Sequence, residues 1–444
     1  MNTAFLREHI VELGVTYLHE RNRALARSFP MTTELLSPAG DFEKLRAAIR
    51  YGADAVYLAG EAFGMRAASA NFTNEELSEA VSYAHERGVK IYITVNILPR
   101  TKEYEALRPY LIFLESIGVD AVIVSDLGVF TLVREVAPKL AIHISTQASS
   151  VSAQACTAWY KMGASRVVLA RELSMAEIRE IRENTPPELE LEAFVHGAMC
   201  IAYSGRCLLS NYFTGRDGNH GMCAQPCRWN YNELVITEEK RPDDRVHVIE
   251  DHGDTFVMSS RDTCMIEHVP ELIEAGITSF KIEGRVKSAY YTAVVTNTYR
   301  MAIDAYLASP ENYVYNPLWM RELCSVSHRE YHTGFYFTPP HESANTVTAP
   351  GYIREKAYLA IAATDSDENG YATFIQRNKV IANAPMELLT PGKVGIPFVA
   401  SDMTNEAGEA IESAPHPMMR FTMRTDVPVR AGDIVRAGDA ESDL

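Results

Sequence analysis

Four of the seven cysteines in this 444-residue chain fall within one short segment, as Cys200, Cys207, Cys223 and Cys227, and a fifth, Cys264, follows after a longer gap. Soft thiolates gathered by loops are the ligands that an iron–sulfur cluster or a closed zinc site requires. Disulfides and ordinary buried thiols are the alternatives, because free cysteine is also a common small core residue. The clustering favours a metal centre.

The start of the chain bears on the choice between metal and disulfide. Residues 1–32 show a charged amphipathic pattern that predicts a helical extension, and they contain no apolar signal-peptide core. No apolar stretch approaches the length of a membrane-spanning helix. We therefore expect a cytoplasmic protein with no membrane partner, in which thiols stay reduced and metal ligation is favoured. Met31 is an alternative start, which would make the residues before it dispensable.

Composition and charge narrow the class of protein. The chain is 47% hydrophobic and 23% charged, and its 58 acidic against 42 basic residues leave a formal net charge of −16. These values are typical of a globular protein with one large and one small domain. A negative field argues against non-specific coating of nucleic acid or of anionic membranes, but it leaves room for a local basic patch that binds one structured RNA.

From residue 33 the chain alternates short β-branched runs with amphipathic helical patterns. Glycines end several of these helices in C-cap-like positions and precede the next strand: Gly52, Gly88, Gly118, Gly163 and Gly276. The predicted strands are 34–39, 55–60, 90–96, 121–126, 141–147, 166–172, 189–195 and 279–285. Eight such units match a TIM-type (β/α)8 barrel in number and length. An open doubly wound sheet is the runner-up, but no glycine-rich dinucleotide turn follows the first strand.

Polar residues end the predicted strands, and active sites of such barrels lie at the carboxyl ends of the strands. His196, Gln147 and Glu283 are the candidate catalytic residues among them. His196 is equally well explained as a core histidine or as a group that contacts a cluster sulfur. Gln147 could bind a planar substrate edge or cap the next helix.

The remaining segments complete the predicted domain organisation. The barrel spans 33–308, with an abnormally long cysteine-rich insert at 197–259 after strand seven; loops of such length are usually functional or disordered. Cys264 is expected in the first turn of the helix after this insert. A proline-punctuated connection, 309–350, leads to a small all-β domain at 351–444, which is predicted to form a small barrel.

Three blocks of the sequence resemble the U32 peptidase-like family: EAFVHGAMCIAYSGRCLLS, SFKIEGRVKSAYY and ELLSPAGDFEKLRAAIRYGADAVYLAG. The resemblance covers nearly the whole chain from residue 33. Within the family, SGRCLLSNYFTGRDGNHGMCAQPCRWNY is most similar to the prephenate-dependent tRNA wobble-uridine hydroxylases. The resemblance implies tRNA modification by hydroxylation of uridine 34 at C5, giving 5-hydroxyuridine, with a [4Fe–4S] cluster and prephenate as cofactors.

The resemblance also bears on the metal ligands and on the partners. Cys264 stands where some relatives supply a cluster ligand, whereas the tRNA branch often lacks a cysteine there. We expect Cys200, Cys207, Cys223 and Cys227 to hold the cluster, with Cys264 as a buried neighbour or an alternate ligand. A homo-oligomer, or a hetero-oligomer with a paralogue, is left open.

Prephenate is a dicarboxylate, so a barrel mouth that binds it needs fixed cations. The expected cofactor-binding residues are Arg66, Arg171, Lys281 and Arg285. Lys281 and Arg285 share one face of strand eight, where Glu283 could hold Arg285 by an ion pair. The alternative is that these charges form an internal ring of salt bridges at the barrel rim.

Basic and aromatic residues of the insert predict contacts with tRNA. The expected RNA-binding residues are Arg206, Arg216, Arg228, Trp229 and Arg261, with Tyr231 as a further ring that could stack on a base. Their alternative roles are a solvated surface for the arginines and a shield against water for the aromatic rings.

Other functions fit the sequence less well. A U32-type peptidase or collagenase is the main alternative, but the chain contains neither an HExxH helix nor a GxSxG turn. The cysteine spacing differs from the CxxxCxxC of radical S-adenosylmethionine enzymes. A zinc-binding module without catalysis, and a hydroxylase of ribosomal RNA or of the quinone ring, remain as further alternatives.

Overall fold

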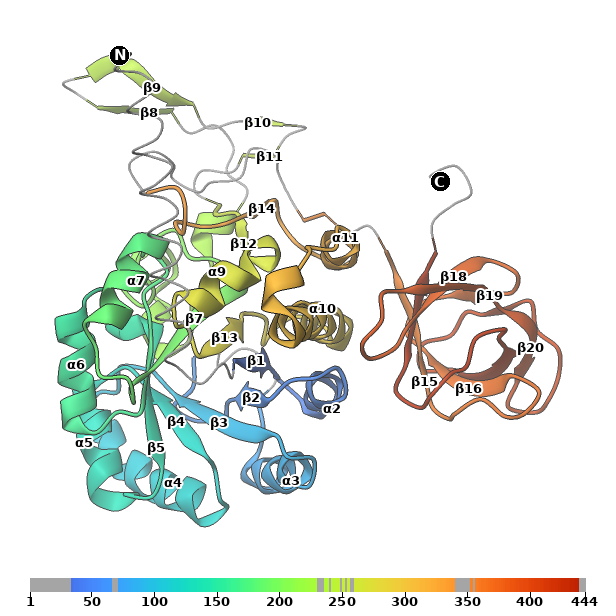
Figure 1. Ribbon diagram of the computed structural model, residues 1–444, viewed down its shortest axis with the longest axis horizontal. Coiled ribbons are helices and arrows are strands. Elements are labelled where there is room, and N and C mark those ends of the chain that lie inside the picture. Colours follow the sequence, from blue (N-terminus) through green and yellow to red (C-terminus); the bar gives the residue numbers. More distant parts are fainter. Residues whose placement is uncertain are drawn as a thin grey trace.

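The structure, a computed structural model, shows an α/β barrel followed by a separate β domain (Figure 1). It describes residues 33–65, 71–229, 235–238, 241–247, 250–251, 254–255, 259–339, 352–353 and 356–438. The predicted helical extension 1–32, Arg66 and Tyr231 therefore lie outside the described residues. Among the helices that the structure describes, none combines the length and apolarity needed to cross a bilayer.

Eight parallel strands close into the predicted TIM-type barrel. In order they are β1 (Glu34–Pro38), β2 (Ala55–Leu58), β3 (Lys90–Val95), β4 (Ala121–Val124), β5 (Ala141–Ile144), β6 (Arg166–Val168), β7 (Glu190–Ala198) and β13 (Ser279–Ile282). Each strand pairs with the next in this order, and β13 closes the barrel by pairing with both β7 and β1. All eight predicted strands and the fold class are thereby confirmed.

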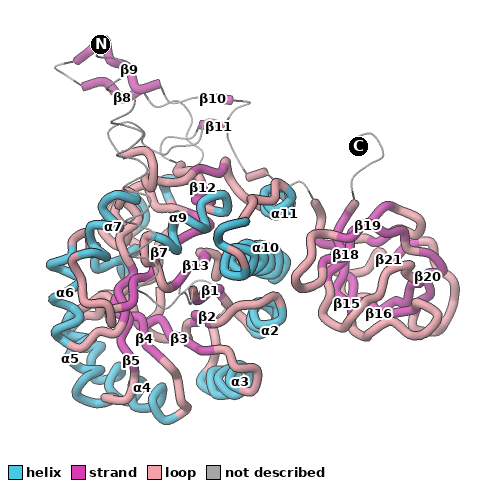
Figure 2. Tube along the Cα trace, viewed as in Figure 1, coloured by secondary structure: helices cyan, strands magenta, loops and turns pink. Residues whose placement is uncertain are grey.

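Helices surround the strands, as Figure 2 shows. Those of the repeating units are α2 (Phe42–Arg50), α3 (Asn74–His85), α4 (Tyr104–Ser116), α5 (Leu127–Val136), α6 (Ala153–Met162), α7 (Met175–Glu183), α9 (Val269–Glu274) and α10 (Ala289–Ala308). Local sequence determines where several begin and end. Thr73 and Glu76 form a capping box at α3, and Gly163 ends α6 in the left-handed region at φ 110°.

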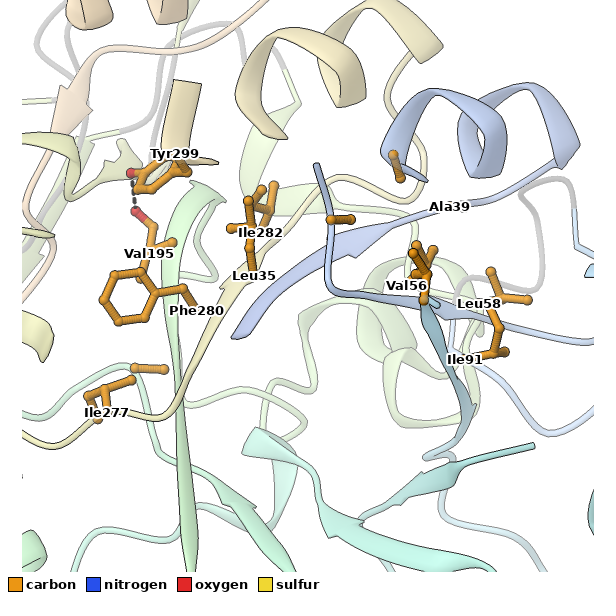
Figure 3. Close-up of a cluster of buried hydrophobic side chains, with 14 of the residues drawn as sticks. Leu35, Ala39, Val56, Leu58, Ile91, Val195, Ile277, Phe280, Ile282 and Tyr299 are labelled. Carbon is orange, nitrogen blue, oxygen red and sulfur yellow. Dashed lines mark hydrogen bonds between the residues drawn. The ribbon is translucent and has the colours of Figure 1, made fainter. Parts of the chain in front are cut away.

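The core lies between the strands and this ring of helices. Leu35, Val56, Ile91 and Phe280, from four neighbouring strands, are buried and belong to one hydrophobic cluster (Figure 3). The helices add apolar stripes to it, such as Leu107, Leu111 and Leu114 of α4 and the long, almost wholly buried α10. Burial of this apolar surface stabilises the barrel and holds the strand ends in place.

The cysteine-rich insert follows β7, as predicted. It contains α8 (Leu209–Thr214), the short 3₁₀ turns η3 (Gly218–His220) and η4 (Pro226–Arg228), and the strand pairs β8 (Val235–Glu238) with β9 (Arg241–His247) and β10 (Glu250–Asp251) with β11 (Asp254–Thr255). The chain returns to the barrel through β12 (Asp262–Cys264), whose neighbour on its other side is β14 (Tyr331–His332).

The position of Cys264 differs from the sequence-based expectation. It lies in β12, not in a helix, because β7 continues to Ala198 and offers its free edge to an antiparallel partner. In that pairing Cys264 is opposite His196 and Thr263 is opposite Gly197. The helix α9 begins only at Val269.

The C-terminal domain is antiparallel and all-β, as predicted. Its main sheet has the order β19 (Ile396–Val399), β18 (Pro385–Leu389), β23 (Ile434–Ala437), β15 (Tyr358–Ala362), β16 (Tyr371–Gln376), β22 (Arg420–Arg424) and β20 (Ser401–Asn405), and a second pair joins β17 (Val380–Ile381) to β21 (Ser413–Ala414).

The domain packs beside α2, α10 and α11 (Leu318–Cys324) (Figure 1). A buried ionic group joins it to the barrel: Arg436 contacts Glu322 of α11 and Glu387 of β18, each at 2.7 Å. The hydroxyl of Tyr51 donates a hydrogen bond to the carbonyl of Leu389 at 2.8 Å. These specific buried contacts indicate a firmly attached domain.

Candidate functional site

A large pocket opens at the carboxyl ends of the barrel strands, where barrel enzymes place their sites. It measures about 1240 Å³ including its open mouth. Its floor comes from strand residues, namely Tyr57, Thr94, Ile123, Val168, Phe194 and Lys281. Its cover comes from the insert after β7, which contributes residues from Cys200 to Arg228. The abnormal loop therefore closes over the barrel mouth.

The four clustered cysteines, Cys200, Cys207, Cys223 and Cys227, all line this one pocket. The thiols of all seven cysteines in the chain are free. Burial raises the pKa of Cys227, Arg228 lowers it, and the other three thiols are close enough to raise it further. The insert thus brings the four predicted ligands together.

Among the described residues, no group of three or more His, Cys, Asp or Glu side chains is arranged to hold a single metal ion. The four thiols that line the pocket are nevertheless the soft ligands that an iron–sulfur cluster requires. The backbone N–H of Gln225 also donates to the sulfur of Cys223 at 3.4 Å, a contact that tunes the potential of cluster sulfurs. The donor set fits an iron–sulfur cluster.

Cys264, the alternate ligand, lies elsewhere. It is 5% exposed, does not line the pocket and has the hydroxyl of Tyr299 4.0 Å from its sulfur. Burial raises its pKa to about 12, which keeps the thiol protonated. This placement suits a buried neighbour of the site.

His196 lies in the same interior layer, away from the pocket. The hydroxyls of Tyr299 and Tyr331 are 3.5 and 3.4 Å from its two ring nitrogens. Burial lowers the pKa of His196 to about 3, so the ring is neutral. The adjoining Gly197 has φ 101° and lies so close to the backbone of Glu283 that a Cβ there would be 2.3 Å from the carbonyl oxygen. Both residues therefore support the local packing of β7 against β13.

Arg171, Lys281 and Arg285, which were expected to bind prephenate, all line the pocket. Arg171 stacks on the ring of Phe194, with its guanidinium carbon 3.6 Å from the ring centre. It donates to the carbonyl of Ala198 at 2.7 Å and lies 3.4 Å from a carboxylate oxygen of Glu283. Its Nε is buried and has no hydrogen-bond partner among the described residues.

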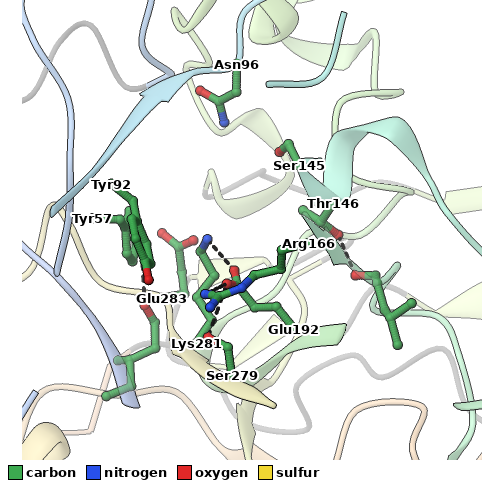
Figure 4. Close-up of polar contacts among 12 residues, drawn as sticks. Tyr57, Tyr92, Asn96, Ser145, Thr146, Arg166, Glu192, Ser279, Lys281 and Glu283 are labelled. Carbon is green, nitrogen blue, oxygen red and sulfur yellow. Dashed lines mark hydrogen bonds and ion pairs between the residues drawn. The ribbon is translucent and has the colours of Figure 1, made fainter. Parts of the chain in front are cut away.

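Lys281 is engaged in an ion pair, as one of the sequence-based alternatives proposed. Its Nζ lies 2.7 Å from Glu192, and both side chains are buried. Glu192 also contacts Arg166, which reaches Glu34 at 2.6 Å and Glu190 at 2.7 Å (Figure 4). The carboxylate of Glu192 thus offsets most of the positive charge of Lys281.

Arg285 is 3% exposed and donates to the hydroxyl of Thr94 at 2.9 Å. Glu283, which was expected to hold Arg285, forms an ion pair with Arg171 at 3.4 Å. Strand β13 ends at Ile282, so Glu283 and Arg285 both lie in the segment that follows it. The pocket lining is therefore rich in cations, and Glu283 contributes a carboxylate to it. The cations are Arg171, Lys281, Arg285 and Arg228 of the insert.

Two side-chain amides stand on the opposite wall of the pocket. Asn96 follows β3 directly and donates through Nδ2 to Oε1 of Gln147 at 2.6 Å. Gln147 belongs to the short turn η2 (Thr146–Ala148) after β5. Gly205 of the insert packs on its side chain. Asn96 was not among the candidate residues of the sequence analysis, although its position directly after β3 was an available signal.

The predicted RNA-binding residues divide into three groups. Arg206, Arg216 and Trp229 are exposed on the insert. Arg228 turns inward and donates to Oε1 of Gln225 at 3.0 Å. Arg261 is paired with Glu330 at 3.0 Å.

Aromatic side chains that the sequence analysis did not single out accompany the exposed group. Tyr212 is 82% exposed and Phe213 49% exposed, and the ring of Phe213 lies 6.3 Å from that of Trp229. The indole N–H of Trp229 is used by the carbonyl of Ala224, which leaves its ring surface for contacts. Exposed aromatics and cations together suit unpaired nucleotides.

Comparisons with known proteins give matches over most of the chain. The sequence pattern of Peptidase family U32 matches residues 40–346, and that of the Peptidase family U32 C-terminal domain matches residues 354–436. A solved structure described as the U32 peptidase Mk0906 shares 16% identity and covers 56% of this chain and 92% of its own, with a TM-score of 0.38.

Three curated relatives carry different names. A Bacillus subtilis (strain 168) protein named tRNA hydroxylation protein P1 is 38% identical over 91% of this chain and 94% of its own length. A Methanocaldococcus jannaschii protein named Uncharacterized protease MJ0090 is 45% identical over 68% of this chain and 73% of its own. An Escherichia coli (strain K12) protein named 23S rRNA 5-hydroxycytidine C2501 synthase is 39% identical over 61% of this chain and 39% of its own.

Proposed function

Because this chain belongs to peptidase family U32, whose members include relatives named for RNA hydroxylation, we propose that it is an RNA-hydroxylating enzyme. Its proposed reaction is hydroxylation of uridine 34 of tRNA at C5, dependent on prephenate and on a [4Fe–4S] cluster. Replacement of C5–H by C5–OH adds one oxygen atom and removes two electrons from the base, so the reaction also requires an oxygen donor and a two-electron acceptor as co-reactants. The observation that carries the proposal is the convergence of four thiols, buried cations and side-chain amides in one pocket.

The cluster would be held by Cys200, Cys207, Cys223 and Cys227, and it would supply one-electron redox chemistry beside the bound base. The insert contributes the backbone donor of Gln225 and covers the mouth, which limits the access of water. Exclusion of water strengthens electrostatic contacts inside the pocket and suppresses side reactions.

Prephenate would bind at the cationic side of the pocket. Arg171 supports this assignment because its guanidinium is held on Phe194 and by Ala198, so it is preorganised to receive a carboxylate. Arg285 would bind the second carboxylate while Thr94 steadies it. Lys281 is expected to contribute less, since Glu192 already neutralises it.

The anticodon loop would approach over the exposed part of the insert. Arg206 and Arg216 would contact phosphates, and Tyr212, Phe213 and Trp229 would stack on unpaired bases. A target base must leave its stack to reach a pocket of this depth, and stacking of its neighbours offsets part of that cost. Because the chain as a whole is acidic, its net charge would repel RNA. Binding would therefore depend on this local group of arginines and aromatic rings.

Peptide hydrolysis has weaker support from the site. A cysteine nucleophile needs a neighbouring base, most often a histidine. Among the described residues that line the pocket there is no histidine, and His196 is buried outside it. Several similar thiols would also compete for the role of nucleophile.

The decisive experiment is mass spectrometry of tRNA nucleosides from cells that lack this protein. We expect loss of 5-hydroxyuridine and its derivatives, restored by the wild-type gene and not by a Cys223→Ala gene. An unchanged nucleoside profile, or restoration by the Cys223→Ala gene, would contradict the proposal. Anaerobic purification with iron and sulfide analysis tests the cluster independently, and a zinc-only protein would exclude it.

A further inference from the structure

Two of the side-chain amides that line the pocket, Asn96 and Gln147, form a relay of defined direction. The backbone N–H of Met65 donates to Oδ1 of Asn96 at 3.1 Å. A backbone N–H is always a donor, so the atom of Asn96 that receives it must be the oxygen. The other amide atom of Asn96 is therefore the nitrogen, and it donates to Gln147 at 2.6 Å.

The orientation of the Asn96 amide also fixes the orientation of the Gln147 amide. Its Oε1 accepts from Asn96 and also from the hydroxyl of Ser145 at 3.3 Å, so the oxygen is occupied on the wall of the pocket. Its Nε2 makes no hydrogen bond within the part of the chain that the structure describes, and Gln147 lines the pocket. Gln147 thus offers the pocket a donor and keeps its acceptor turned away.

The position of this donor relates it to the thiols. Gly205, in the loop that joins Cys200 to Cys207, has φ 77° and lies so close to Gln147 that a Cβ there would be 3.1 Å from Cβ and Cγ of the glutamine and 3.3 Å from Nε2. A ligand held by Gln147 would accordingly lie beside the cysteine segment, where the reacting carbon of a base must be.

We propose that Gln147, oriented by Asn96, is the residue that selects uracil over cytosine in this pocket. This inference rests on the proposed RNA hydroxylation. Uracil carries an acceptor oxygen on C4, next to the reacting C5, whereas cytosine carries a donor amino group there. A side-chain donor of fixed direction can hydrogen-bond to the C4 oxygen of uracil, whereas it would face another donor in the amino group of cytosine. The family includes a relative named for 5-hydroxycytidine, so the choice of pyrimidine is a real question for this site.

The test compares two anticodon stem-loop RNAs that differ only in having uridine or cytidine at the wobble position. Affinities are measured for the iron-replete full-length protein, and hydroxylated nucleosides are measured by mass spectrometry. The wild type is expected to prefer uridine. Gln147→Glu keeps an acceptor for Asn96 but turns a second acceptor to the pocket, so the preference for uridine should fall about ten- to a hundred-fold.

Asn96→Asp tests the relay without touching Gln147. An aspartate would still accept from Met65, but its second oxygen would also be an acceptor, so the amide of Gln147 should turn over and present its oxygen to the pocket. The preference for uridine should fall in the same direction. Gln147→Met, which removes the donor without adding charge, should bind both RNAs with similar affinity.

Gln154→Glu is the matched control, because it adds the same charge to an exposed glutamine of α6 that does not line the pocket. It should leave the ratio of the two affinities near the wild-type value. Retention of the wild-type ratio in Gln147→Glu and Gln147→Met would overturn the inference while the proposed function stands. Loss of prephenate affinity in Gln147→Glu with that ratio unchanged would also overturn it, since the donor would then serve a carboxylate. A wild-type protein that neither binds nor modifies either RNA would remove the proposed function together with this inference.

Discussion

The two ends of the barrel interior both carry charged side chains, but these serve opposite purposes. At the amino-terminal end, Arg166 lies among Glu34, Glu190 and Glu192, and the hydroxyl of Tyr92 also donates to Glu34. At the carboxyl-terminal end, the cations line a cavity and the thiols and Gln147 face it. Charge is compensated inside the protein at the first end, whereas at the second it is arranged for a ligand.

This difference separates stability from function within one layer of residues. A buried charge is costly unless it is paired, so loss of one member of the ionic cluster of Arg166 should destabilise the barrel. The polar groups at the barrel mouth lie where water or a ligand can form hydrogen bonds with them. Lys281 stands at the border, since it lines the pocket but is paired with Glu192 below. Four experiments can break or sharpen this contrast.

The largest effect is expected at the thiols. Cys207→Ala and Cys223→Ala should each remove the iron and abolish hydroxylation, and they should also loosen the insert, because ligation of a metal is coupled to folding. Iron and sulfide analysis of anaerobically purified protein measures this. Cys264→Ala should keep its iron, since that thiol lies outside the pocket. Full iron in Cys207→Ala would refute the four-ligand assignment, and loss of iron in Cys264→Ala would make Cys264 a ligand.

The second effect concerns stability. Arg166→Met should lower the free energy of unfolding by about 3–5 kcal/mol at neutral pH, because it strands buried carboxylates without their partner. Urea denaturation measures the loss. Arg108→Met is the matched control: it breaks the exposed pair of Arg108 with Glu135 and should cost at most about 1 kcal/mol. Equal effects of the two substitutions would contradict the view that the amino-terminal cluster stabilises the fold.

The same pair of proteins predicts a pH dependence. Burial alone would raise the pKa of Glu34, but the charge of Arg166 and their hydrogen bond bring it below its ordinary value of 4.5. A carboxyl whose folded pKa is lowered contributes stability above its unfolded pKa and loses it as the pH falls through the folded value. The stability gap between wild type and Arg166→Met should therefore narrow below about pH 4.5. A gap that widens in acid would show that Glu34 is not stabilised by Arg166.

The third effect concerns the small molecule. Arg285→Lys and Arg171→Lys should weaken prephenate binding by about 1.5–3 kcal/mol, roughly ten- to a hundred-fold, because lysine cannot give two parallel hydrogen bonds to a carboxylate. Calorimetric titration of folded, iron-replete protein measures this. Arg261→Lys, whose parent arginine pairs with Glu330 outside the pocket, should bind as the wild type does. Wild-type affinity in Arg285→Lys would remove that residue from the site.

The smallest effects are expected on the surface of the insert. The dependence of tRNA affinity on salt should be shallow, with a slope of roughly two to four, and Arg206→Gln or Arg216→Gln should each lower it by about one. Trp229→Ala should cost about 1–3 kcal/mol of affinity with little change in that slope, as expected for a stacking contact. A slope near ten would reveal a basic surface outside the described part of the chain.

Much of the fold was predictable because its signals are local. Most of the barrel strands are short apolar runs that contain β-branched residues, and each of the five glycines expected to end a helix has a positive φ. Such backbone preferences depend on near neighbours in the chain, so they can be read without knowledge of the tertiary structure. Cys264 was the exception, because its strand forms only through pairing with the distant edge of β7.

The sequence predicted which residues belong to the site better than it predicted the contacts between them. The four thiols, Arg171 and Gln147 all line the pocket, as their places in the chain suggested. The ion pair of Glu283 with Arg171, from another strand, was not among the predicted contacts. Ion pairs across a barrel depend on strand register and on side-chain direction, which a linear pattern does not contain.

The sequence by itself determined which groups are present and at which ends of the strands they stand: thiols in a loop after β7, cations after β6 and along β13, amides after β3 and β5. Only the tertiary structure decided which of them are satisfied. Lys281 is neutralised by a residue 89 positions away, and Gln147 is oriented by one 51 positions away. Closure of the barrel brings such residues within hydrogen-bond distance, and a hydrogen bond of fixed direction determines whether a side chain offers its pocket a donor or an acceptor.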